Sequence, residues 1–574
     1  MRIITRSLKP YLGLVILSLV LLGVGSIADL MMPNLMSYIV NDGIMAGNNT
    51  VIYRMGGLML LAAAANLLAR FTNGYVSSRS ATGMSRYLRS ALFRRVQTFS
   101  SSETVQFGTS SLITRSTTDV AQLQGFINMF LRMGVTAPIM AVGGAFMAFS
   151  KSPKLASVLI ITLPILILAV IGISRFALPI TRSMLEKVDR VNLVMREKLT
   201  GVRVIRAFGT EEYEQQRFDT ANRDLTETAL KMSRIMSGML PIMTIALNLA
   251  SVIVVYMGAL EASYGNLLVG DIMAVVQYVS QMLGSAMMIS MAFVIWPRAS
   301  ASAARIGEIL DTETTITDGA QSAADVHGGI AFDHVSFRYP GADRASLEDI
   351  SFEVRPGKTT AIIGSTGSGK STLLGLMLRF YDPTEGSVSL GSVDIRDLTV
   401  DSYRGKLGYV PQRAVLFSGT AAENIRMGSM DASDDAVHLA ADIAQASEFI
   451  QSRDAGYDSR IEQGGANLSG GQKQRLSIAR AVVRKPEVYI FDDSFSALDF
   501  QTDAKLRRRL GEVMGESAVL IVAQRVSTIM DADSIVVLNE GRIAGIGTHA
   551  ELLKTCKVYQ EIVLSQLSAE EAVG

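Results

Sequence analysis

The residues best suited to chemistry form a glycine-rich run at positions 364–372, Gly-Ser-Thr-Gly-Ser-Gly-Lys-Ser-Thr. The run follows an apolar, strand-like segment at 360–363 and opens a predicted helix. In such a loop, backbone N–H groups face phosphate oxygens, the lysine reaches the β- and γ-phosphates, and the hydroxyl after it ligates Mg²⁺. The positive end of the helix dipole also faces the anion. The predicted ligands are Gly364, Ser365, Thr366, Gly367, Ser368, Gly369, Lys370, Ser371 and Thr372, with Ser371 on the metal.

A second apolar run ends in two acidic residues. Residues 488–492, Val-Tyr-Ile-Phe-Asp, predict a short buried strand whose last residue, Asp492, is placed to hold Mg²⁺ through a water molecule. Asp493 follows directly. The expected cofactors are therefore ATP and Mg²⁺.

Two further runs lie on either side of this strand: Leu-Ser-Gly-Gly-Gln at 468–472 and Ser-Ala-Leu-Asp at 496–499. With them the sequence resembles an ATP-binding cassette (ABC) ATPase, whose signature motif is LSGGQ and whose D-loop is SALD. The resemblance covers the whole chain. It implies that the signature of one ATPase domain closes over the ATP held by the phosphate loop of another. The residues expected to serve nucleotide binding in this way are Ser469, Gly470, Gly471, Gln472 and Asp499.

Three other segments fit or depart from the family pattern. Tyr339 resembles the aromatic residue that stacks on adenine, although a tyrosine packed at a sheet edge is the alternative. Gln412 resembles the glutamine whose amide reaches Mg²⁺ and the attacking water. Residues 462–465, Glu-Gln-Gly-Gly, depart from the Gly-Glu-Arg-Gly order usual in homodimeric members and resemble one half of heterodimeric exporters.

Two positions carry residues unsuited to fast hydrolysis. Asp493 stands where the family has a glutamate that polarises the attacking water, and its carboxylate is one methylene too short. Gln524 stands where the family has a histidine, and an amide cannot become cationic. Because a homodimer would contain two impaired sites, these changes predict a degenerate catalytic site and a second, non-identical half-transporter chain as partner.

The first half of the chain carries the apolar residues. Of 574 residues, 49% are hydrophobic and 19% charged, which is too apolar for a wholly soluble enzyme of this size. Six stretches approach or exceed the length that crosses a bilayer. They span residues 11–40, 55–69, 126–149, 155–174, 239–260 and 272–295. These spans contradict a soluble ABC ATPase of DNA repair or translation, and no nucleic-acid partner is expected.

Basic residues near the helix ends predict the orientation in the cell membrane. Arg2, Arg6 and Lys9, and the arginines after the second and fourth spans, place the N-terminus, both long loops and the ATPase domain in the cytoplasm. Lys151 and Lys154 oppose this rule at the turn after the third span. The first span lacks a signal-peptide cleavage pattern and is expected to be retained. The one cysteine excludes an internal disulfide.

The order of the segments predicts four parts and an α-helical membrane bundle followed by an α/β phosphate-loop ATPase domain. The parts are a membrane domain at 1–310, a linker at 311–328, a nucleotide-binding domain at 329–566 and a tail at 567–574. Residues 108–120 and 197–212 resemble the two cytoplasmic coupling segments of ABC exporters. The membrane domain precedes the ATPase in one polypeptide, which is the order of exporters.

Few residues in the sequence indicate the substrate. Asp29 lies within the first span, where an ionisable residue marks a wet pathway for a cationic or amphiphilic ligand. The alternative is that it sits near the outer leaflet or pairs with a neighbouring helix. Flexible methionines in the last two spans suit promiscuous binding but also ordinary packing. They are Met236, Met239, Met243, Met273, Met282, Met287, Met288 and Met291. Efflux of small hydrophobic molecules is expected, with export of lipid, peptide or siderophore, or a non-pumping regulatory subunit, as alternatives.

Overall fold

A computed structural model describes residues 2–566 of the chain. Side chains are described at these positions except at residue 2 and at some positions within 163–182, 239–243 and 290–294. The predicted tail at 567–574 therefore lies outside the described residues, and so do the side chains of Met239, Met243 and Met291.

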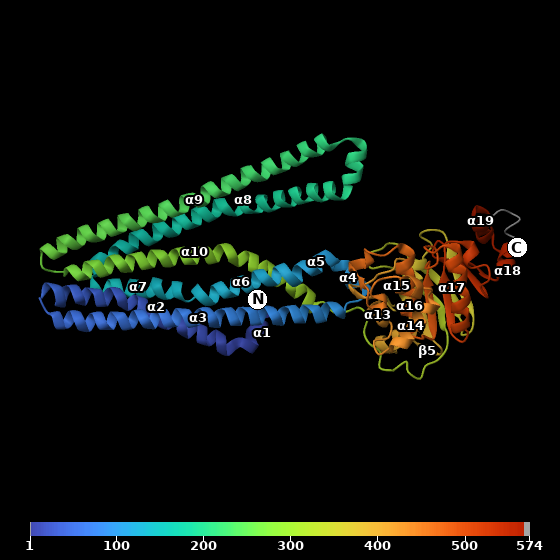
Figure 1. The fold of residues 1–574 in the computed structure, drawn as a ribbon. Helices are drawn as coiled ribbons and strands as arrows, with labels where there is room; N and C mark the ends of the chain where they lie inside the picture. The colour runs from blue at the N-terminus through green and yellow to red at the C-terminus, as the bar shows by residue number, and fades with distance from the viewer. Residues whose placement is uncertain (1, 567–574) are drawn as a thin grey trace. The chain divides into compact units, whose positions relative to one another are not determined.

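The chain divides into two units (Figure 1). The first contains the residues up to Gln97 and Thr109–Thr312. The second contains Thr98–Gly108 and the chain from Glu313 onward. The first is built of helices and the second is an α/β domain, so the predicted fold class is confirmed.

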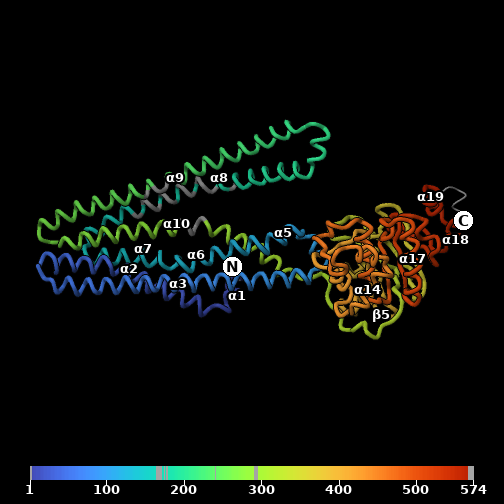
Figure 2. The backbone as a smooth tube through the Cα atoms, in the orientation of Figure 1, coloured from blue at the N-terminus to red at the C-terminus, as the bar shows by residue number. Residues whose placement is uncertain are grey.

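The helical unit consists of long helices joined by short turns (Figure 2). Its elements are α1 (Arg2–Leu8), η1 (Lys9–Tyr11), α2 (Leu12–Tyr38), η2 (Ile39–Met45), α3 (Asn49–Gln97), α5 (Thr109–Thr114), η3 (Arg115–Asp119), α6 (Val120–Met133), α7 (Thr136–Lys151), α8 (Pro153–Phe208), α9 (Glu211–Ser263) and α10 (Val269–Asp311). At 1.5 Å per residue, α3, α8, α9 and α10 each exceed the roughly 30 Å of a bilayer core. They therefore extend beyond the hydrocarbon layer.

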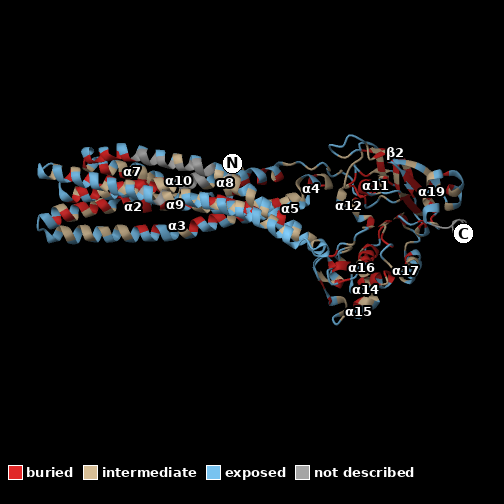
Figure 3. Ribbon diagram, turned by 90° about the horizontal axis from the view of Figure 1, so that it is seen from above, coloured by how far each residue is buried: buried red, intermediate tan, exposed pale blue. Residues whose placement is uncertain are grey.

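Helices are present for all six predicted membrane spans. Five apolar segments among the described residues are long enough to cross a membrane: Ile3–Met45, Asn49–Gln97, Thr109–Lys151, Thr244–Ser263 and Val269–Ile289. The remaining span is the start of α8, where Pro153–Thr162 is apolar. Many apolar side chains of the helical unit are exposed, for example Leu60 and Phe71 on α3, as expected for residues that face lipid or another chain (Figure 3).

Glycine ends the longest helix. Gly209 has φ 63°, and its N–H bonds to the carbonyl oxygen of Ile205, which terminates α8 before α9 begins at Glu211. The two helices run antiparallel from this turn (Figure 2). The turn lies within residues 197–212, the predicted second coupling segment.

The α/β unit contains three sheets. One has the order β2-β1-β4-β5, a second the order β12-β11-β3-β10-β9-β6, and a third pairs β7 with β8. The strands are β1 (Ile330–Phe337), β2 (Leu347–Val354), β3 (Thr359–Gly364), β4 (Glu385–Leu390), β5 (Val393–Asp394), β6 (Leu407–Val410), β7 (Gly419–Thr420), β8 (Arg460–Ile461), β9 (Val488–Asp492), β10 (Ala518–Val522), β11 (Ser534–Asn539) and β12 (Arg542–Gly547).

Helices cover these sheets and enclose an apolar core (Figure 3). They are α4 (Ser101–Phe107), α11 (Lys370–Met377), α12 (Val400–Gly405), α13 (Ala421–Arg426), α14 (Asp434–Ile443), α15 (Ser447–Gln451), η4 (Gly456–Asp458), η5 (Gln463–Gly465), α16 (Gly470–Val483), α17 (Phe500–Val513), η6 (Val526–Thr528), α18 (His549–Thr555) and α19 (Lys557–Gln566). The central strands read as unbroken apolar runs because both their faces are buried, as Ile362, Ile490 and Leu520 show.

The six-stranded sheet brings the predicted site together. Strands β11, β3, β10, β9 and β6 are parallel, so their carboxyl ends share one edge. The phosphate loop follows β3, Asp492 ends β9, Gln524 follows β10, and Gln412 follows β6. Ligands of open α/β sheets bind at this edge.

The packing of α4 differs from the expected division of the chain. Thr98–Gly108 belongs to the α/β unit, although it falls within the predicted membrane domain at 1–310. The predicted coupling segment at 108–120 instead begins where this segment ends, and Thr109 onward packs within the helical unit. The short helix that packs with the α/β unit therefore lies just before this segment, and both predicted coupling segments stay predictions. The other predicted boundaries stay predictions.

Candidate nucleotide site

The phosphate loop joins β3 to α11 at the carboxyl edge of the sheet. Gly369 has φ 105°, and a Cβ there would lie 2.6 Å from a methyl carbon of Leu347, so a larger residue would strain the loop. The Lys370 ammonium donates hydrogen bonds to the carbonyl oxygens of Gly364 and Ser365 at 2.7 and 2.8 Å. The cation therefore lies directly over the loop whose N–H groups are expected to bind phosphate.

Lys370 is partly desolvated in this position. Burial lowers the pKa of its ammonium, while the negative charges of Asp492 and Asp493 act in the opposite direction. A cation with fewer water contacts gains more from a phosphate group than an exposed lysine does. The arrangement suits tight binding of a polyphosphate.

The acidic pair lies at the end of β9. Asp493 adopts the left-handed conformation, with φ 45°, which aspartate tolerates better than most residues. Its Oδ2 accepts a hydrogen bond from Nε2 of Gln412 at 3.2 Å, and its N–H bonds to the carbonyl oxygen of Val522 at 2.7 Å. Gln412 and Asp493 are thus in contact.

Asp492 is partly buried at the end of β9. Burial raises the pKa of its carboxyl group, and the neighbouring charge of Asp493 raises it further. The Tyr409 hydroxyl lies 3.5 Å from its Oδ2, and burial together with this carboxylate raises the pKa of Tyr409 as well. A bound divalent cation would offset the charge repulsion between the two carboxylates.

These groups line one cavity of about 1060 Å³. The predicted residues on its wall are Thr366, Gly367, Gly369, Lys370, Ser371, Thr372, Gln412, Asp492, Asp493 and Gln524. One carboxylate, one hydroxyl and one amide around phosphate oxygens fit Mg²⁺, which keeps several waters and needs few protein ligands. The residues present therefore fit a magnesium nucleotide, with Asp492, Ser371 and Gln412 as the groups that would hold the metal.

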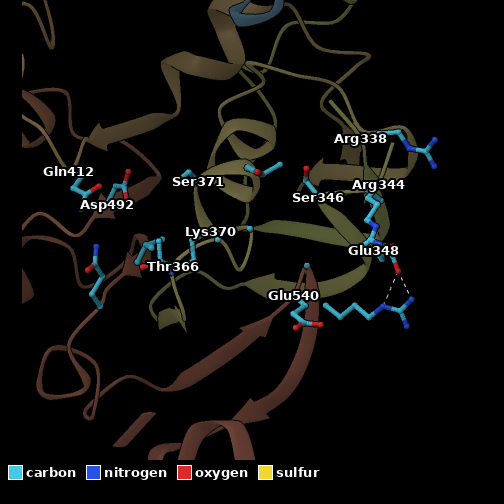
Figure 4. A pocket seen from close by; sticks show the side chains of 18 of the residues that line it. Arg338, Arg344, Ser346, Glu348, Thr366, Lys370, Ser371, Gln412, Asp492 and Glu540 are labelled. Atoms are coloured by element: carbon cyan, nitrogen blue, oxygen red, sulfur yellow. Dashed lines mark hydrogen bonds and ion pairs between the residues drawn. The ribbon is translucent and has the colours of Figure 1, made fainter. Parts of the chain in front are cut away.

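The cavity also has a charged end that the motifs did not reveal. Its wall includes Arg338, Asp343, Arg344, Glu348, Glu540 and Arg542. Figure 4 shows Arg338, Arg344 and Glu348 on one side of Lys370, with Gln412 and Asp492 on the other. Arg542 pairs with Glu348 across β12 and β2. No local sequence pattern marks these residues, because they come from two segments that lie far apart in the sequence, at 338–348 and 540–542.

Tyr339 is close to this cavity but does not line it. Its ring packs edge-on against Phe337 and Tyr381, with centroids 4.9 and 5.3 Å away. Its hydroxyl lies 3.1 Å from Oγ1 of Thr372 in the phosphate-loop helix. The structure thus has the packed tyrosine that the sequence left as an alternative, and stacking on adenine stays a prediction.

Gln524 follows β10 and its side chain is exposed toward the cavity. Its carbonyl oxygen accepts a hydrogen bond from Nε2 of Gln566 at 2.8 Å, and Gln566 also accepts from the N–H of Val526 at 2.9 Å. The backbone of this turn is therefore fixed while the amide of Gln524 stays available to a ligand.

The signature segment, residues 468–472, does not line this cavity. Ser469 caps α16: its Oγ accepts from the N–H of Gln472 at 3.3 Å, and Oε1 of Gln472 accepts from the N–H of Ser469 at 2.9 Å. Ser469 and Gly470 are exposed, and neither lines the cavity. Asp499 likewise caps α17 by accepting from the N–H of Thr502 at 3.0 Å.

Asp29 is paired within the helical unit. Its carboxylate accepts hydrogen bonds from Arg70 and Asn66 on α3, and Gln281 on α10 donates to its carbonyl oxygen at 3.2 Å. The Arg70 side chain is half-exposed and that of Asp29 only 26% exposed. The structure thus contains the pairing with a neighbouring helix that was one of the two alternatives, and Met282, which is buried, packs in the core.

The two lysines that oppose the orientation rule are both paired. Nζ of Lys151 lies 2.9 Å from Oδ1 of Asp271 and 3.1 Å from Oγ of Ser37. Nζ of Lys154 lies 2.8 Å from Oε1 of Glu261. Each lysine therefore joins helices at this end of the unit, which gives it a structural reason to be there.

Comparison with known proteins agrees with this architecture. Residues 15–286 match the model of the ABC transporter transmembrane region, and residues 347–496 match the ABC transporter model. An ABC transporter ATP-binding protein of Mycobacterium tuberculosis strain H37Rv is 41% identical over 100% of this chain and 99% of its own length. The chain belongs to the ABC transporter family. It is a half-transporter, with one membrane domain and one ATPase domain.

Two other relatives are similar over the membrane and ATPase domains of this half-transporter. A multidrug efflux ATP-binding/permease protein of M. tuberculosis is 31% identical over 94% of this chain, which spans 45% of that protein. The solved structure of a bacterial Atm1-family ABC exporter with ATP bound has a TM-score of 0.83 at 27% identity, covering 98% of this chain and 99% of the other. The half-transporter thus has the fold of an ABC exporter.

Proposed function

We propose that this half-transporter is one half of a heterodimeric, ATP-driven exporter and carries the slowly hydrolysing ATP site. One observation carries the proposal. The same cavity wall contains the groups that bind a magnesium nucleotide, such as Lys370 and Asp492, and the two residues poorly suited to activate water, Asp493 and Gln524.

The proposed partner supplies a second ATP site. Ser469 and Gly470 are exposed and do not line their own chain's cavity, so they are free to close over ATP bound by another chain. In that arrangement the partner's phosphate loop, with its own glutamate and histidine, performs most of the hydrolysis. ATP at this chain's site holds the two ATPase domains together between cycles.

Purification and enzymology test the heterodimer directly. The chain is extracted from its native membrane through an affinity tag, and the co-purifying chains are identified by mass spectrometry. We expect a second ABC half-transporter in equal amount, and ATP turnover by the pair that exceeds turnover by this chain alone. Equal, brisk turnover by this chain alone, as a dimer of identical copies, would overturn the proposal.

The proposed cargo is a small hydrophobic or amphiphilic molecule in the cell membrane. The multidrug relative and the apolar, methionine-containing spans support this class. We further propose that Asp29 influences whether charged or neutral molecules are exported. The D29N variant tests this, because it leaves the Arg70 guanidinium without its carboxylate partner. Export of a cationic dye should then fall relative to a neutral dye in inside-out vesicles. Equal effects on both dyes would remove charge selection by Asp29.

The proposed orientation places the N-terminus and the ATPase domain in the cytoplasm. It rests on the arginines that follow the second and fourth spans. Labelling of single cysteines from outside intact cells tests it: a cysteine at Lys154 should react, and one at Arg206 should not. The opposite pattern would overturn the orientation.

A further inference from the structure

Glu103 is a buried carboxylate that the nucleotide site does not use. It lies in α4 and is 2% exposed. Its Oε2 accepts a hydrogen bond from the N–H of Ser100 at 2.6 Å, and its Oε1 accepts one from the N–H of Thr315 at 3.1 Å. The hydroxyls of Ser100 and Thr315 are also 3.0 Å apart. We call Ser100, Glu103 and Thr315 the Glu103 clasp.

The charge of Glu103 fits this geometry. Burial raises the pKa of its carboxyl group, but the hydrogen bonds from Ser100 and Thr315 outweigh burial and the pKa is lowered overall. The group is therefore ionised at neutral pH, and both of its oxygens act as acceptors. A buried charge without these donors would be strongly destabilising.

A second buried side chain connects the same linker to the phosphate loop. Arg379 follows α11 and is 1% exposed. Its guanidinium donates to the carbonyl oxygens of Thr317 and Leu398, each at 2.8 Å, and lies 3.3 Å from Oδ1 of Asp382. Arg379 thus fixes the linker two residues beyond Thr315.

The Glu103 clasp lies where two membrane helices enter the α/β unit. Helix α3 ends at Gln97, shortly before Ser100, and α10 ends at Asp311, shortly before Thr315. Ser100, Glu103 and Thr315 themselves belong to the α/β unit. The clasp therefore joins, inside the ATPase unit, the segments that continue directly into α3 and α10.

We propose that Glu103 is a positioning residue that makes the entry segments of α3 and α10 move as one body with the phosphate-loop helix. Displacement of α11 on nucleotide binding passes through Arg379 to Thr317, and from Thr315 through Glu103 to α4. Both membrane helices of the same chain are then drawn together. The inference rests on the proposed ATP-driven function, because it assigns the path by which that ATP acts.

Glu103→Gln is the sharpest perturbation. Glutamine has one acceptor oxygen, so its NH₂ group would face one of the two backbone N–H donors and that hydrogen bond would be lost. Glu313→Gln is the matched control, since Glu313 is an exposed acid in the same linker. The full-length assembly is reconstituted in lipid nanodiscs, with its partner chain where one co-purifies. Affinity for a fluorescent MgATP analogue and hydrogen exchange of α3 and α10 with and without MgATP are measured.

We expect E103Q to bind the nucleotide within about twofold of the unmodified protein. Its MgATP-dependent change of exchange in α3 and α10 should fall about tenfold, as for loss of a hydrogen bond to a buried charge. E313Q should match the unmodified protein in both. An E103Q response equal to that of E313Q would overturn the inference. If the unmodified assembly binds no MgATP, the proposed function itself fails, which is a different result.

A reversible cross-link gives a second, independent test. Because the hydroxyls of Ser100 and Thr315 are 3.0 Å apart, S100C and T315C are placed close to the reach of a disulfide. C556A first removes the one native cysteine. Oxidation of E103Q/S100C/T315C should restore the MgATP-dependent change of hydrogen exchange in α3 and α10, which we call the MgATP response. Reduction should abolish this response again. A folded, oxidised protein that stays unresponsive would overturn the inference.

The same cysteine pair serves if E103Q fails to fold. With Glu103 intact, the oxidised S100C/T315C protein should keep its full MgATP response, because the joined segments move together. A response that is lost on oxidation and regained on reduction would mean that the segments must separate during the cycle. That result would also overturn the inference.

Discussion

Lengthening the acidic side chain at position 493 should speed ATP hydrolysis at the site proposed to be slow. Asp493→Glu adds one methylene, about 1.5 Å of reach, and Gln524→His supplies a group that can become cationic. The Asp493 carboxylate now ends 3.2 Å from the Gln412 amide. A misplacement of this size costs on the order of 100-fold in rate, or about 2.7 kcal/mol of activation free energy.

The expected gain is therefore divided between the two positions. D493E alone should raise ATP turnover at this site by roughly 10-fold, because Gln524 still donates only a neutral hydrogen bond, which is about half as strong as a charged one. D493E/Q524H should approach a gain of roughly 100-fold. The longer side chain has a cost in stability rather than rate: at φ 45° a glutamate is less favourable than an aspartate, by about 1 kcal/mol.

The assay follows single turnovers of labelled ATP in the purified assembly, with the partner's phosphate-loop lysine replaced so that only this chain's site reports. D493N is the matched control, because it keeps the shape of the side chain and removes its charge. It should eliminate the residual turnover. Variants that bind MgATP normally and hydrolyse it no faster than the unmodified chain would refute the assignment of positions 493 and 524 as the limiting groups.

Three further outcomes follow from the structure. K370A removes the cation over the phosphate loop and should weaken MgATP binding at least about 100-fold, measured by fluorescence titration. Burial, and then repulsion from Asp493, raises the pKa of Asp492, so protons compete with Mg²⁺ there and MgATP affinity should fall as the pH is lowered through that raised pKa. D493N should shift this loss to lower pH in the same titration. K151M leaves the partly buried Asp271 carboxylate without its cation and should cost up to about 3 kcal/mol in thermal unfolding, while K151M/D271L should recover most of it.

The sequence predicts which residues gather at the carboxyl edge of the six-stranded sheet, because these residues lie at the ends of strands that neighbour one another in the sheet. The phosphate loop, Asp492 and Gln412 each follow a recognisable apolar strand, and parallel pairing places such ends side by side. Arg338 and Arg542 carry no comparable signal. They reach the same cavity from the connection after β1 and from β12, which belongs to a different sheet.

The membrane helices can also be predicted from the sequence, whereas their junction with the α/β unit cannot. Hydrophobicity alone indicates the six spans, since each must cross an apolar layer without help from distant residues. Helix α4 is short and polar, and only its capping pair, Ser100 and Glu103, is visible locally. Its partner Thr315 is 212 residues away from Glu103, so no local pattern in the sequence reveals that this helix packs with the α/β unit.

On the cavity wall, the residues that depart from the family pattern are the two proposed to act on water, Asp493 and Gln524. Lys370, Ser371 and Asp492, which bind phosphate and metal, are of the expected types and line one cavity. Asp493 is held by Gln412 and by a backbone conformation that suits aspartate, so its surroundings accommodate the shorter acid. On the proposed function, a pocket that keeps these ligand contacts and cleaves ATP slowly stays occupied by ATP for longer. ATP held there would contribute binding energy to closure of the two proposed ATPase domains, and the timing of reopening would depend on the proposed partner's site.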